Sequence, residues 1–106
     1  MSLSTKCPAR ADYLFNTGIK PVVLEQIRGH AKKYRIQKVI LFGSRARGAF
    51  HRDSDIDLAV SGRNADLFRL SVEEETDTLL TYDVVDLDHI VSVELLDVIW
   101  KEGIVL

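Results

Sequence analysis

Residues 38–42 read Lys-Val-Ile-Leu-Phe and end at Gly43, so four apolar residues follow one another without a polar break. Such a run is typical of a β-strand that other parts of the chain cover on both faces. A covered strand requires further helices or strands above and below it. The 106 residues fit a single domain of this kind, and 46% hydrophobic with 28% charged residues is typical of a globular chain.

The rest of the chain alternates between helical and extended patterns. Apolar residues spaced by three and four predict a helix over residues 21–34, and strict alternation predicts a strand over residues 55–60. The other expected elements are a helix over 64–80, capped by Asp66 or restarted by Ser71 with Glu74, a strand over 82–87, a helix from Ser92 to Gly103 and an edge strand over 103–106. These elements predict one α/β (α+β) domain over residues 19–106, after a poorly defined lead-in over residues 1–18.

Charge and cysteine content exclude several classes of protein. The net charge of −2 provides no basic field for a long nucleic acid. A single cysteine, Cys7, cannot form an internal disulfide, and no apolar run approaches the roughly 18 residues of a membrane helix. We therefore expect a soluble, cytoplasmic protein without a membrane partner. Its Lys and Arg residues crowd the first half and its acids dominate from Asp53 onward, so a site at this boundary would meet both signs of charge.

Gly43 and Ser44 stand where the apolar strand turns into a short helical start. Backbone N–H groups at such a start lack partners and attract anions, glycine allows a close backbone approach, and serine adds a hydroxyl donor. Arg45 and Arg47 supply positive charge at the same place. Taken alone, a Gly-Ser turn is more often a simple helix cap, and arginines are more often solvated surface residues. A pair of aspartates further along the chain carries a sharper signal.

Asp55 and Asp57 lie two residues apart on the second predicted strand, so their carboxylates point to the same side. Two such charges repel each other unless a cation lies between them, and Mg²⁺, which prefers oxygen ligands, is the natural candidate. A site for two metal ions needs a third carboxylate. Asp83 and Asp86 both lie on the third predicted strand, but alternation places them on opposite faces, so only one of them can reach the site.

Gly43-Ser44, ten further residues and then Asp55-Ile56-Asp57 resemble the signature of the DNA-polymerase-beta-like nucleotidyltransferase superfamily. The longer strings that start at Leu41 and at Ser54 are similar to its minimal nucleotidyltransferase (MNT) group. The resemblance implies a small mixed β-sheet with helices packed on one face and a nucleotide site on the other. It implies that Asp55, Asp57 and a third carboxylate at Asp83, with Asp86 as the alternative, are catalytic metal ligands, most often for two Mg²⁺ ions. It further implies that Gly43 and Ser44 bind the triphosphate of ATP, and the local positive charge of Arg45 and Arg47 makes us expect both to bind the nucleotide as well.

The same resemblance implies a biological role. MNT proteins are often paired with a helical HEPN toxin and act as the antitoxin, in some cases by transferring AMP to the toxin. We therefore expect a protein adenylyltransferase whose acceptor is a HEPN partner, because 106 residues leave no room for a separate acceptor domain. The alternative is a binding module that neutralises the partner by contact and carries a vestigial nucleotide site. The sequence does not determine the preferred nucleotide, the choice between Mg²⁺ and Mn²⁺, or the oligomeric state, and a homo-oligomer is possible.

Overall fold

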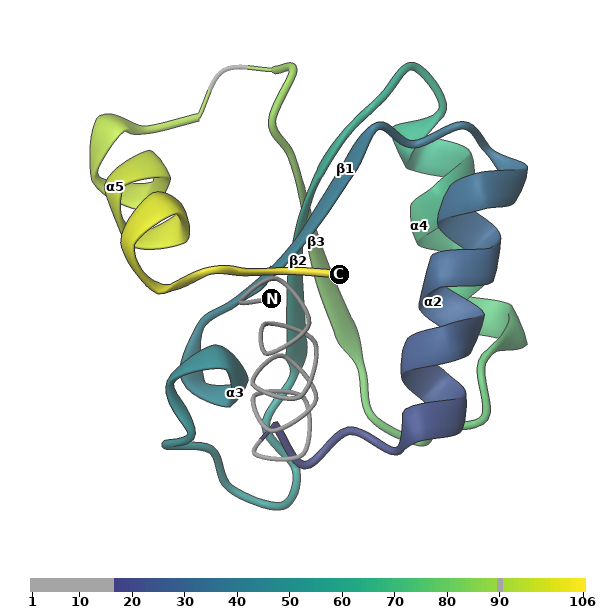
Figure 1. The fold of residues 1–106 in the computed structure, drawn as a ribbon, viewed down its shortest axis with the longest axis horizontal. Coiled ribbons are helices and arrows are strands. Elements are labelled where there is room, and N and C mark those ends of the chain that lie inside the picture. Colours follow the sequence, from purple (N-terminus) through teal and green to yellow (C-terminus); the bar gives the residue numbers. More distant parts are fainter. Residues whose placement is uncertain (1–16, 90) are drawn as a thin grey trace, which may run out of the picture.

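The computed structural model describes residues 17–89 and 91–106, which form helices and strands in regular alternation (Figure 1). Cys7 and most of the predicted lead-in lie outside the described residues. The elements in chain order are α2 (Pro21–Lys33), β1 (Lys38–Phe42), α3 (Ser44–Arg47), β2 (Ile56–Ser61), α4 (Ala65–Glu75), β3 (Tyr82–Asp86), α5 (Val93–Glu102) and β4 (Ile104–Val105). In the described part of the chain, no helix is long and apolar enough to cross a membrane.

The four strands form one mixed sheet in the order β3-β2-β1-β4. Strand β1 runs antiparallel to both β2 and β4, whereas β2 and β3 are parallel. The parallel connection is made through helix α4, as a crossover between parallel strands requires. The predicted mixed sheet is therefore confirmed, and its two central strands β1 and β2 are the two whose apolar patterns are strongest in the sequence.

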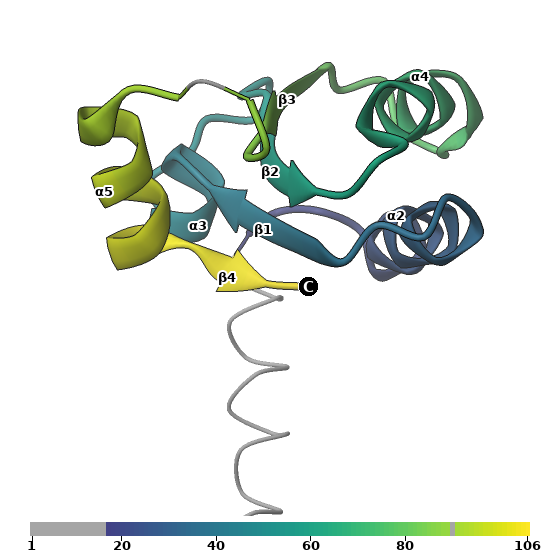
Figure 2. The same ribbon diagram turned by 90° about the horizontal axis from the view of Figure 1, so that it is seen from above.

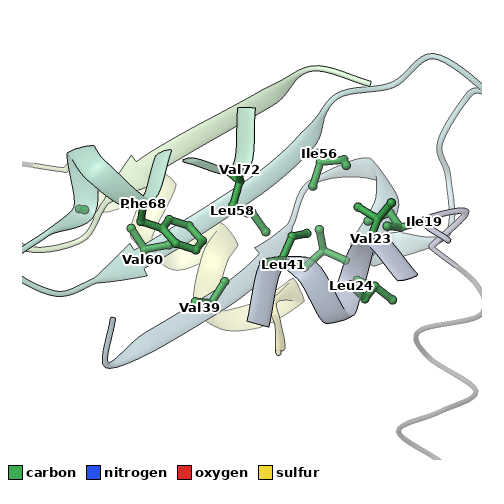
Figure 3. Packing of buried hydrophobic residues seen from close by; sticks show 12 residues of the cluster. Ile19, Val23, Leu24, Val39, Leu41, Ile56, Leu58, Val60, Phe68 and Val72 are labelled. Carbon is green, nitrogen blue, oxygen red and sulfur yellow. The ribbon is translucent and has the colours of Figure 1, made fainter. Parts of the chain in front are cut away.

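Helices α2 and α4 cover one face of this sheet. Every second residue of β2, starting at Ile56, points to that face and packs with Leu41 of β1 and Phe68 of α4 (Figure 3). Ile27 of α2 belongs to the same cluster. All of these side chains are fully buried. Removing one large apolar side chain from water contributes about 1.5–3 kcal/mol, so this cluster is the main source of stability.

Helix α5 lies on the opposite face of the sheet (Figure 2). Its buried Ile99 packs against Ile40, Phe42 and Ala59, which are the residues of β1 and β2 that point away from the main core. The expected placement of helices on one face therefore holds for α2 and α4, while α5 covers part of the other. The second cluster explains why residues 39–42 contain no polar break: their side chains enter two different cores.

Several element boundaries differ from the expected ones for local reasons. Helix α4 ends at Glu75 rather than near residue 80, because Thr76 is extended and its hydroxyl donates to the carbonyl oxygen of Val72. Ser71 does not start a second helix, since it lies within α4 and its hydroxyl is 2.6 Å from Nδ1 of His30. Residue 64 rather than Asp66 precedes the first turn, and no side chain caps it.

Candidate active site

Three aspartates gather where β2 and β3 begin. Asp57 of β2 is the Cα partner of Asp83 of β3, so the two residues lie side by side in the parallel pair. Asp55 directly precedes β2, and its charge also acts on Asp57. Asp57 is half-buried, whereas Asp55 and Asp83 are exposed. By strand alternation Asp57 points to the sheet face that carries Ala59, which is the face of helix α5.

The carboxylates perturb one another. Burial, followed by the charges of Asp83 and Asp55, raises the pKa of Asp57 from 3.8 to about 6, while Arg45 and Arg47 act in the opposite direction. A raised pKa means that the ionised form is disfavoured in this position. A cation held between these groups would remove that penalty.

Gly43 brings the backbone against this cluster. It connects β1 to α3 with φ 77° and ψ −158°, a region essentially restricted to glycine. A β-carbon at this position would overlap with Oδ2 of Asp57. The carbonyl oxygen of Gly43 accepts the amides of Ala46 and Arg47, whereas the amides of Ser44 and Arg45 donate to no backbone oxygen of the described residues. The Gly-Ser turn predicted from the sequence is thus in direct contact with the aspartates.

The side chain of Arg45 lies inside the protein, where the sequence had suggested a surface residue. We expected it to bind a nucleotide, but its side chain is only 1% exposed and points into the protein. Its guanidinium donates to three carbonyl oxygens, those of Thr17 at 2.8 Å, Ser54 at 3.0 Å and Arg52 at 3.2 Å. With its donors used in this way, Arg45 is not available as a surface ligand for phosphate.

Arg47, by contrast, is exposed and lies near the acids. Its guanidinium forms an ion pair with Glu102 of α5 at 3.1 Å, and its charge lowers the pKa of Asp57. An exposed ion pair of this kind contributes little to stability and is easily rearranged. Arg47 therefore remains a candidate for contact with a bound anion.

Asp86 lies away from the cluster. It is the Cα partner of Val60, and its carboxylate is bonded to Nδ1 of His89 at 2.7 Å and to the amide of Asp88 at 2.9 Å. These bonds close the turn after β3. Of the two acids that the sequence left as alternatives, only Asp83 stands beside Asp57.

Thr81 is a residue of the site that the sequence analysis missed. Its hydroxyl donates to Oδ1 of Asp55, and its carbonyl oxygen accepts the amide of Ile56 at 2.9 Å. Asp55 is thereby held by its carboxylate and through the residue that comes after it. Only the parallel pairing of β2 with β3 brings Thr81 next to Asp55, and the sequence does not specify that pairing.

The donor chemistry of the cluster suits a hard divalent cation. The described residues contain no group of three or more His, Cys, Asp or Glu side chains that could hold a metal ion by themselves. Mg²⁺, however, is commonly bound by one or two carboxylates together with substrate phosphates and water. The mutual repulsion at Asp57 and the adjoining Gly-Ser turn fit such a shared arrangement.

A small mixed sheet with a Gly-Ser turn against paired aspartates defines the chain as a nucleotidyltransferase-type domain. Residues 25–106 match the family described as "Polymerase beta, Nucleotidyltransferase". This match spans most of the chain, and the protein therefore belongs to the polymerase beta nucleotidyltransferase family.

Similar solved structures belong to toxin–antitoxin pairs. A toxin–antitoxin structure with AMP-PNP is 27% identical over 74% of this chain and 68% of its own, with a TM-score of 0.58. A tyrosine-to-alanine variant of the toxin–antitoxin pair MntA–HpeT is 27% identical over 77% of this chain and 69% of its own, with a TM-score of 0.60. A second MntA–HpeT variant, in which two aspartates two residues apart are glutamate, is 24% identical over 76% and 69%, with a TM-score of 0.60, and supports the fold. No protein of curated function matches the sequence. The resemblance to MNT-type antitoxins is thus confirmed.

Proposed function

We propose that this protein transfers a nucleoside monophosphate, AMP from ATP, to a hydroxyl group on a HEPN toxin and so acts as its antitoxin. The observation that carries the proposal is the register of β2 and β3, which sets Asp57 beside Asp83. Family membership and a neighbour solved with AMP-PNP support nucleotide chemistry, and neighbours named as toxin–antitoxin pairs support the partner.

The proposed roles follow from the positions of the side chains. Gly43, Ser44 and Arg47 bind the triphosphate, Gly43 by close backbone approach, Ser44 by its hydroxyl and Arg47 by its charge. Asp55, Asp57 and Asp83 would hold Mg²⁺ together with the phosphates of the bound nucleotide, and we expect two ions. The metal supplies neutralisation of the charge on the reacting phosphates. Arg45, which the sequence suggested as a further ligand, is left out because its guanidinium is engaged inside the protein.

In the proposed reaction, the acceptor oxygen attacks the α-phosphorus of ATP. A new oxygen–phosphorus bond forms, the bond between the α-phosphorus and the bridging oxygen breaks, and pyrophosphate leaves with the electron pair. The proton of the acceptor hydroxyl passes to a carboxylate of the site, for which Asp83 is exposed and adjacent to Asp57. The protein contributes positioning and charge neutralisation, as in other phosphoryl-type transfers.

Neutralisation by contact is the second candidate function. Helix α5 exposes Val93 to 77% and Trp100 to 58%, and apolar side chains exposed on one helix can serve as a protein interface. Contact and catalysis make different demands on Asp55 and Asp57, because an interface on α5 does not need their charge.

The experiment incubates a candidate HEPN toxin with this protein, ATP and Mg²⁺ and measures the mass of the toxin. The proposal predicts a gain of one or more AMP units that is absent with Asp55→Asn/Asp57→Asn. Asp86→Asn serves as a control, because Asp86 lies away from the cluster. If the double variant neutralises the toxin as well as the wild type does, the contact mechanism replaces the catalytic one.

A further inference from the structure

We propose that Arg45 is a positioning residue that holds the segment carrying Asp55 in its binding geometry, and that Thr81 completes this function by fixing the Asp55 carboxylate. This inference rests on the proposed function, since it concerns how one of the metal-binding carboxylates is presented. It assigns to the first arginine after the Gly-Ser turn a role other than phosphate binding.

Arg45 is the most buried charged residue among the described ones, and its surroundings are built around it. The guanidinium carbon lies 4.8 Å from the ring centre of Phe50, so the aromatic ring covers the charged group. Gly18 lies against both groups: a β-carbon there would lie 2.8 Å from Nη1 of Arg45 and would overlap with Phe50. A buried arginine is rare unless it is hydrogen-bonded, and here each of its three nitrogens donates a hydrogen bond.

The three bonds of Arg45 tie together parts of the chain that are separate in sequence. Nη1 donates to Thr17, which is 28 residues away, while Nε and Nη2 donate to Ser54 and Arg52. Ser54 directly precedes Asp55. A planar guanidinium with donors in fixed directions therefore determines where the segment before Asp55 runs, which a flexible ammonium group could not do.

The loop has a second internal support, and Asp55 a support at its side chain. The amide of His51 donates to the hydroxyl of Ser54 at 2.8 Å. The Thr81 hydroxyl donates to Oδ1 of Asp55, so Oδ2 would be the oxygen offered to a cation. Arg45 thus fixes the backbone before Asp55 and Thr81 fixes its carboxylate, so two separate parts of the chain act on the same residue.

The test measures binding rather than transfer, so that no acceptor is needed. Binding of the non-hydrolysable nucleotide AMP-PNP with Mg²⁺ is titrated by calorimetry for the wild type, Arg45→Met and Arg45→Lys. Backbone hydrogen exchange over residues 49–55 is followed in the same proteins. We expect at least tenfold weaker binding and faster exchange for both variants, because lysine keeps the charge but not the three bonds.

A control separates this effect from general destabilisation. Ile27→Val alters the main core on the other face of the sheet, and it is compared at a temperature where all variants are folded by circular dichroism. It is expected to bind nucleotide as the wild type does. If Arg45→Lys binds within twofold of the wild type and keeps its slow exchange, charge rather than positioning is what matters and the inference is wrong.

Thr81→Val keeps the inference testable if the Arg45 variants do not fold. Thr81 is exposed, and valine preserves its shape without the hydroxyl. We expect a several-fold higher Mg²⁺ concentration for half-maximal AMP-PNP binding, with Thr81→Ser restoring the wild-type value. An unchanged Mg²⁺ requirement in Thr81→Val would overturn the role of the hydroxyl.

Failure of the proposed function can be told apart from failure of this inference. If the wild type itself binds no nucleotide, the proposed function fails. Hydrogen exchange in Thr81→Val and in the Arg45 variants still decides whether Thr81 and Arg45 order residues 49–55.

Discussion

The α-carbon of Gly43 faces the carboxylate of Asp57 so closely that a β-carbon would overlap with Oδ2. Gly43 also has a φ of 77°, which side chains disfavour. We predict that Gly43→Ala displaces Asp57, abolishes nucleotide binding and costs about 1–3 kcal/mol of folding stability. Calorimetric titration and urea unfolding measure the two effects.

Gly29→Ala is the matched control for this substitution. Gly29 lies within α2, and a β-carbon there would meet nothing within 4 Å. Alanine in a helix interior is expected to stabilise the protein by about 0.5–1 kcal/mol without affecting nucleotide binding. Equal losses of binding in the two variants would show that the contact between Gly43 and Asp57 is not what matters.

Asp83 and Asp86 provide a second pair of matched variants. Asp83→Asn removes a charge beside Asp57 and is predicted to reduce transfer of AMP at least a hundredfold. Asp86→Asn weakens the bonds to His89 and Asp88, so we expect a stability loss of about 1 kcal/mol and near-normal transfer. Rates of pyrophosphate release with a HEPN acceptor measure this difference, and a greater loss in Asp86→Asn would reverse the assignment.

The raised pKa of Asp57 predicts a pH dependence of stability. Burial, Asp83 and Asp55 raise this pKa to about 6 in the folded protein, above the ordinary 3.8. The folded state therefore binds the proton more tightly than the unfolded state, so this group's contribution to stability falls as pH rises from about 4 to about 6. Its destabilising effect is fully present above pH 6.

Replacing Asp57 with asparagine removes that titration. In metal-free buffer, the Tm of Asp57→Asn relative to the wild type is predicted to be higher at about pH 7.5 than at about pH 4.5. Thermal unfolding followed by circular dichroism at both pH values gives the comparison. A Tm difference that does not change with pH would mean that Asp57 does not titrate in this range.

Added Mg²⁺ is predicted to raise the Tm of the wild type at neutral pH in the presence of AMP-PNP. A ligand that binds only the folded state stabilises it by about 2.7 kcal/mol at one hundred times its Kd. Asp55→Asn/Asp57→Asn is expected to show no Mg²⁺-dependent increase. An equal increase in the double variant would place the cation elsewhere.

Local patterns were sufficient to predict the strands of the central sheet. The alternation of Ile56, Leu58 and Val60 and the unbroken run at residues 39–42 are properties of short segments, and the structure has strands at both places. Strand geometry alone also predicted that Asp83 and Asp86 point to opposite faces of the sheet. What parity could not decide was which of them faces Asp57, because that depends on the register between β2 and β3.

Contacts between segments that are distant along the chain could not be predicted from the sequence. Arg45 looks like a surface cation in the sequence, and only the approach of Thr17 and Phe50 makes its burial possible. The hydrogen bond from Thr81 to Asp55 likewise depends on the pairing of two strands. The position of α5 across the sheet from α2 and α4 is set by Ile99 meeting the second apolar face, which a pattern within α5 does not reveal.

Transfer of the α-phosphate together with its nucleoside is the central feature of the proposed activity. It is tested most directly by incubating the protein with Mg²⁺, a candidate HEPN toxin and ATP labelled on either the α- or the γ-phosphate. We predict that the toxin acquires the α-label, that the γ-label leaves as pyrophosphate, and that Asp55→Asn/Asp57→Asn transfers neither. Transfer of the γ-label, or toxin neutralisation with no label on the toxin, would contradict this mechanism.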